Sequence, residues 1–171
     1  MGSGYIHKEA RRLVRRCGAR DPFQIAKELG IHVIFNYDFQ ALKGMYKVIH
    51  RSRFIFINGN LNKRDRKTVC AHELGHDRFH RRLAKTTALQ EFVLYDMHSR
   101  PEYEANIFAS ELIISDDDIF SLIEDACDIY QMAAELDADM NLILIKIDEL
   151  RKQGYDVRAP YRPKSDFLGR G

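Results

Sequence analysis

His72-Glu73-Leu74-Gly75-His76 is the stretch that decides the fold of this 171-residue chain. It lies within residues 65–82, which have apolar residues at helical positions and are therefore predicted to be a helix. Residues four apart lie on one face of a helix, about 6 Å apart along its axis. The two imidazoles can therefore bind one Zn²⁺ from the same side.

Glu73 follows the first histidine and can reach a water molecule on the metal. It can accept the proton of that water as the water attacks a carbonyl group. Gly75 costs about 1 kcal/mol relative to alanine in a helix interior, and its small size leaves room for another backbone or a substrate. The alternative is an amphipathic helix with surface histidines, which the glycine and the apolar positions argue against. We predict a zinc site at His72 and His76, with Glu73 as general base.

A catalytic zinc site needs a third protein ligand and leaves its fourth position to water. His80 shares a face with the pair, but it lies about 12 Å along the axis from His72, too far to bind the same ion. We expect His80 to support the site or to lie on the helix surface. Phe79 and Arg82 stand where the metzincin extension requires glycine and histidine, which excludes that class.

A second predicted helix, residues 101–112, offers two carboxylates for the third position. Glu104 is followed by Ile107 and Phe108 at i+3 and i+4, so it faces the interior if they are buried. Glu102 is the competitor on another side of the helix. Both acids could instead simply favour the positive end of the helix dipole. We predict Glu104 as the third ligand.

These motifs resemble the ImmA/IrrE family of metallopeptidases from phages, mobile elements and bacterial genomes. The central segments HELGHDRFH and EYEANIFASELI carry the resemblance, and weaker similarity extends over the ranges 21–33, 44–58 and 127–155. The resemblance implies His72 and His76 as ligands, Glu73 as base and one glutamate of the 102–104 pair as third ligand. It also implies cleavage of a helix-turn-helix transcriptional repressor. Ile114-Ser115 departs from the family, because many relatives have a proline there.

The expected fold is α+β: a small zincin-like domain with a short, three-stranded, mostly antiparallel sheet packed on the HExxH helix, followed by C-terminal helices. The predicted strands are residues 31–37, 44–50 and 53–58. We expect one metallopeptidase domain over residues 1–159, a helical subdomain at 128–155 and a flexible tail at 160–171.

Composition sets the outer bounds. A content of 45% hydrophobic residues suits a single domain with a core, and a net charge of +2 predicts no nucleic-acid partner. Three sparse cysteines fit a reducing compartment, and the charged N-terminus lacks the apolar core of a signal peptide. No apolar run approaches the roughly 20 residues of a membrane span. We therefore expect a cytoplasmic protein without a membrane partner; composition leaves its oligomeric state open.

The C-terminal segment 128–155 has two competing interpretations. Its two short helices could form a DNA-binding helix-turn-helix. Residues 141–149, however, carry acids and few cations, whereas a DNA-reading helix needs cations near phosphates. We therefore expect core packing or repressor docking rather than direct DNA binding. The acidic run 116–118 is interpreted as a helix cap and not as a Ca²⁺ site.

The predicted function is that of a zinc endopeptidase acting on a helix-turn-helix repressor. The alternative is a non-catalytic zinc module that sequesters a repressor or a toxin, in which Glu73 would have no use. Tyr95, His98 and Tyr103 are candidates for stabilising the oxyanion. Residues 53–57 are expected to form an edge strand that holds an extended substrate.

Overall fold

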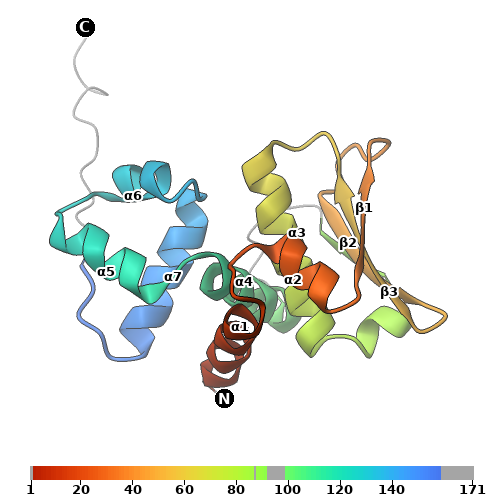
Figure 1. Cartoon of the computed structure of the whole chain (residues 1–171), viewed down its shortest axis with the longest axis horizontal. Helices are drawn as coiled ribbons and strands as arrows, with labels where there is room; N and C mark the ends of the chain where they lie inside the picture. The colour runs from red at the N-terminus through yellow and green to blue at the C-terminus, as the bar shows by residue number, and fades with distance from the viewer. Residues whose placement is uncertain (1, 87, 92–98, 159–171) are drawn as a thin grey trace, which may run out of the picture.

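The computed structural model describes residues 2–86, 88–91 and 99–158, and Figure 1 shows its arrangement. Helices and strands follow one another in this order: α1 (Gly4–Cys17), α2 (Pro22–Glu28), β1 (His32–Asn36), β2 (Gly44–Ile49), β3 (Ser52–Asn58), α3 (Lys63–Phe79), the 3-10 helix η1 (Leu83–Lys85), β4 (Leu89–Glu91), α4 (Arg100–Ile113), α5 (Asp116–Glu124), α6 (Ile129–Glu135) and α7 (Met140–Lys152). Within the described residues, none of these helices has the length and apolar character to cross a membrane.

The sheet confirms the predicted α+β class. Its strand order is β1-β3-β2-β4, with β1 parallel to β3 and β2 antiparallel to both β3 and β4. The three predicted strands are present, and the short β4 adds a fourth. The prediction that residues 53–57 form an edge strand is wrong, because β3 has a neighbour on each side. Alternation of side chains reports which face of a strand is buried, but not how many strands pair with it.

One face of the sheet packs against α2 and α3 (Figure 1). Ile55 and Ile57 of β3 are fully buried there, as is Tyr46 of β2. The Tyr46 hydroxyl donates a hydrogen bond of 2.7 Å to the buried carboxylate of Asp77 on α3, and Arg53 of β3 lies 3.1 Å from the same carboxylate. These bonds fix α3 on the sheet and so set the position of the histidines that it carries.

Helix α4 lies between α1, α3 and α7, at the junction of the sheet half and the C-terminal helices (Figure 1). A buried ionic cluster joins these elements. His7 of α1 lies 3.1 Å from Glu111 of α4 and 3.0 Å from Glu149 of α7, and Lys146 of α7 lies 2.5 Å from Glu111. Burial alone would lower the pKa of His7, but its bonds to the two glutamates outweigh burial and raise this pKa to about 9. The cluster therefore carries charge near pH 7 and fastens α7 to α1 and α4.

The acidic run 116–118 forms the first turn of α5. Ser115 accepts a hydrogen bond from the Asp118 amide, which supports the capping interpretation of residues 116–118. The expected tail, 160–171, lies outside the described residues, and the division at residue 128 remains a prediction.

Candidate metal centre

Helix α3 brings the motif histidines together as its spacing predicts. Asn62 caps the helix by accepting a hydrogen bond from the Asp65 amide, and the helix ends at Phe79, three residues before the predicted end. The side chains of His72 and His76 are almost fully buried, and their Nε2 atoms lie 3.0 Å apart. Both nitrogens thus point at one position between α3 and α4.

Glu102 of α4 completes a three-residue cluster at this position. Its carboxylate oxygens lie 3.0 Å from His72 Nε2 and 3.4 Å from His76 Nε2. Donor atoms bound to one zinc ion in tetrahedral geometry lie roughly 3.3–3.6 Å apart, given bonds of about 2.0–2.2 Å. Two imidazole nitrogens and one carboxylate, converging at this spacing, fit a divalent metal ion.

The electrostatics of the cluster agree with that fit. Burial lowers the pKa of His76 to about 4, so its imidazole is neutral near pH 7. Burial alone would raise the pKa of Glu102, but its bonds to His72 and His76 hold this pKa far below its usual range. Neutral imidazoles and an ionised carboxylate are the protonation states that bind a metal.

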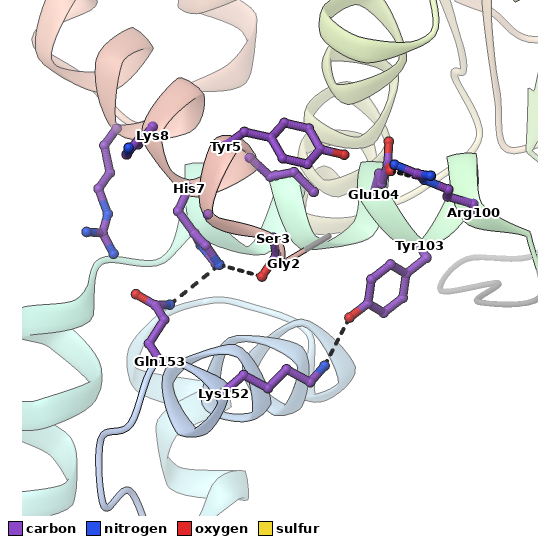
Figure 2. Close-up of a pocket in the computed structure, with 13 residues that line it drawn as sticks. Gly2, Ser3, Tyr5, His7, Lys8, Arg100, Tyr103, Glu104, Lys152 and Gln153 are labelled. Atoms are coloured by element: carbon purple, nitrogen blue, oxygen red, sulfur yellow. Dashed lines mark hydrogen bonds and ion pairs between the residues drawn. The ribbon is translucent and has the colours of Figure 1, made fainter.

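The predicted third ligand, Glu104, is not brought to this cluster. Its carboxylate lies 3.1 Å from His80 Nε2 and accepts a hydrogen bond of 2.6 Å from Arg100. Figure 2 shows Glu104 beside Arg100 on the wall of a cavity formed with the start of α1. The structure therefore brings Glu102, and not the predicted Glu104, to the two histidines.

The burial expected for residues of α4 could not predict which face of this helix meets α3. Every residue from Glu104 to Leu112 is buried, so buried neighbours at i+3 and i+4 do not distinguish one side of the helix from another. The face toward α3 is set by a close helix contact instead. A Cβ atom on Gly75 would lie 2.9 Å from Ala105 Cα, so only glycine permits this approach. Glu102 precedes Ala105 by three residues and therefore lies on the same face.

Both histidines are oriented through their second ring nitrogens. His72 Nδ1 lies 2.9 Å from Asn106 Oδ1, and His76 Nδ1 lies 2.9 Å from His80 Nδ1. When Nε2 faces the metal position, Nδ1 carries the proton and donates it. His80 then accepts from His76 and donates through its own Nε2 to Glu104. His80 is thus a supporting residue, as expected from its distance along the helix.

Glu73 is fully buried beside the first residue of β2. A Cβ atom on Gly44 would lie 2.7 Å from Glu73 Oε1 and 2.4 Å from Val69 Cγ1. The space that the Glu73 carboxylate occupies therefore exists because residue 44 has no side chain.

Of the three candidates for oxyanion stabilisation, the structure describes Tyr103, which does not lie at the cluster. Tyr103 points toward α7, where its hydroxyl lies 3.0 Å from Lys152 Nζ and 3.3 Å from a Glu149 oxygen (Figure 2). Tyr95 and His98 lie outside the described residues.

Sequence reasoning missed two residues of the site. Asn106 follows Glu102 by four residues and so shares its helix face, a signal that becomes useful only once Glu102 is chosen. Gly44 opens a strand, and nothing in the sequence indicates that a glutamate from a later helix lies against it.

Comparison with known proteins identifies the family of this chain. The sequence profile of the Peptidase_M78 family, described as the IrrE N-terminal-like domain, matches residues 26–147 and so extends from the end of α2 through the sheet and the three-residue cluster into α7. The chain belongs to the Peptidase_M78 family. This Peptidase_M78 domain is also 37% identical over 111 residues to "Uncharacterized immunity region protein 2" of Bacillus phage phi105, covering 65% of this chain and 69% of that protein. Family membership confirms the resemblance seen in the two central motifs, and it supports a peptidase.

Proposed function

We propose that the chain is a zinc-dependent endopeptidase in which His72, His76 and Glu102 hold the metal. The convergence of two imidazole nitrogens and one carboxylate carries the proposal: the nitrogens lie 3.0 Å apart, and each lies 3.0–3.4 Å from an oxygen of Glu102. Two histidines from one helix and a glutamate from a later helix, with a fourth position left to water, are typical of catalytic zinc sites. Zinc suits this mixed nitrogen and oxygen donor set.

Glu73 is the general base in this proposal. A bound zinc ion supplies Lewis-acid activation of a water molecule and of the scissile carbonyl. Glu73 accepts the proton of the attacking water and returns it to the leaving amine. Asn106 and His80 keep the two imidazoles in the tautomer that faces the metal, and Gly44 keeps the place of the Glu73 carboxylate open.

The proposed substrate is a helix-turn-helix repressor of a phage or mobile element, cleaved in the cytoplasm. Two observations support this choice. The central motifs resemble those of the ImmA/IrrE peptidases, and the phage phi105 relative is named as an immunity region protein. A relative named for a phage immunity region fits a repressor-related role for this chain.

Incubation of the zinc-loaded protein with the repressor encoded beside its gene tests the proposal, with fragments identified by mass spectrometry. The wild-type chain should produce one or few defined cuts. Glu73→Gln should retain zinc and lose cleavage by orders of magnitude. The matched control is Glu124→Gln, because Glu124 is exposed at the end of α5. Binding of the repressor by wild-type protein without any cleavage would favour a sequestering module instead.

A further inference from the structure

Among the described residues, β1 is an unpaired edge of the sheet, on the side opposite β4. The order β1-β3-β2-β4 places two strand spacings between β1 and β2, the strand against which Glu73 lies. A feature on β1 is therefore separate from the metal centre.

The backbone of β1 is half unpaired. In an extended strand, the N–H and C=O of one residue point to one edge and those of the next residue to the other. The Asn36 carbonyl accepts a hydrogen bond of 2.9 Å from Gly59, on the β3 side. The polar backbone groups of Val33 and Phe35 therefore point outward, and within residues 2–86, 88–91 and 99–158 they form no hydrogen bond. An open edge of this kind is a template for one more strand.

An apolar groove runs along this edge. Its volume is about 530 Å³, and its walls come from the end of α2, β1 and β3. Ile34 and Phe35 are each 40% exposed, and Tyr37 just beyond the strand is 64% exposed. Phe35 packs on Phe23 of α2, with ring centroids 5.9 Å apart, so the walls are held in place before any partner arrives.

The positive charge of the part of the chain around the groove indicates that the partner is acidic. Residues 27–67 contain nine Lys and Arg but only three Asp and Glu, whereas the other 130 residues contain 18 basic and 22 acidic residues. Lys27 lines the groove, and the Arg66 guanidinium lies 5.6 Å from the centre of the Phe35 ring. An acidic partner gains from this surplus. A second copy of this chain, paired through β1, would bring two basic surfaces together.

We propose that β1 docks an extended segment of a partner protein that carries apolar residues on both of its faces and is flanked by Asp or Glu. The segment adds to the sheet beside β1, hydrogen bonds to Val33 and Phe35, and places apolar side chains along Ile34 and Phe35. The outward backbone groups favour a polypeptide over a nucleic acid, because only a polypeptide can continue the ladder. The partner is identified as the repressor substrate only through the function proposed above. Docking at β1 would then let the chain select its substrate by a segment distant from the bond that is cut.

Calorimetric binding of the neighbouring repressor to the Glu73→Gln protein tests this docking without cleavage. Val33→Pro removes an outward N–H donor, a change that edge strands tolerate, and should weaken binding by about tenfold or more. Ile34→Ser should weaken binding by roughly fivefold, and Lys27→Glu should weaken it by a few-fold and reduce its salt dependence. Leu83→Ser is the matched apolar control, because Leu83 is 49% exposed on η1, outside both the groove and the C-terminal helices, and it should change binding less than twofold. Zinc stoichiometry equal to that of the parent protein shows that each variant is folded.

Unchanged affinity in both Val33→Pro and Ile34→Ser would overturn the docking proposal, as would the absence of any binding. Displacement of the repressor by a single-stranded oligonucleotide would assign the surface to nucleic acid. A dimer that Ile34→Ser converts to monomer would assign it to self-association. Repressor that binds through β1 but is never cut by the wild-type chain would leave docking standing and reject the peptidase. Cleavage with no effect of the β1 variants on binding would reject docking alone.

Discussion

Substitution of Gly44 by alanine should separate catalysis from metal binding. The new Cβ atom would lie 2.7 Å from Glu73 Oε1, about 0.7 Å closer than ordinary contact, and 2.4 Å from Val69 Cγ1, about 1 Å closer. Both neighbours are buried, so the Glu73 carboxylate must move by a large part of an ångström. Misplacement of a reacting group by about 1 Å costs roughly 100-fold in rate. Overpacking should also lower the free energy of unfolding by about 1–3 kcal/mol.

The assay is the rate of repressor cleavage, measured together with zinc content and unfolding by denaturant. Gly44→Ala should lose about two orders of magnitude in rate while it binds zinc, because the atoms nearest to the new Cβ belong to Val69 and Glu73 and not to the three proposed ligands. Gly4→Ala is the matched control, because a Cβ atom there meets nothing within 4 Å. A near wild-type rate in Gly44→Ala would refute the role of this glycine in positioning Glu73. Loss of zinc in that variant would refute the separation of ligands from base.

Three further variants test the remainder of the site and the core. Glu102→Ala should abolish tight zinc binding, whereas Glu104→Ala should lower affinity only modestly; equilibrium dialysis measures both, and the reverse order would return the ligand role to Glu104. Asn106→Leu should weaken zinc binding by roughly 10–100-fold, since it removes the acceptor that orients His72; unchanged affinity would count against that role. The free energy of unfolding should fall by on the order of 3 kcal/mol between pH 6.5 and 9, because the pKa of His7 is raised to about 9 in the folded chain and protonated His7 is stabilised below that value. Denaturant unfolding across this range measures the slope, which His7→Gln should remove; a slope that persists in this variant would assign it to another group.

The sequence predicts α3 well because each signal is local. The helical period and the i, i+4 spacing of His72 and His76 both lie within one helix, whose geometry is the same in every protein. The same reasoning excluded His80 as a ligand, and the structure places His80 behind His76.

The proposed third ligand, Glu102, could not be chosen from the sequence of its own helix, α4. Which side of α4 meets α3 depends on the contact of Gly75 with Ala105. The spacing of apolar residues along α4 cannot reveal this contact, because α4 is buried on all sides from Glu104 to Leu112. The position of β3 within the sheet also depends on tertiary contacts. The alternating side chains of residues 53–58 predict a strand, but they do not show that β1 and β2 pair with its two edges.

The position of the metal itself tests the account most directly. Anomalous diffraction at the zinc edge, from crystals of the zinc-loaded protein, locates the ion without reference to activity. We predict one peak per chain, about 2.0–2.2 Å from His72 Nε2, His76 Nε2 and a Glu102 carboxylate oxygen. A peak coordinated by Glu104 or His80, or no peak between α3 and α4, would contradict the account.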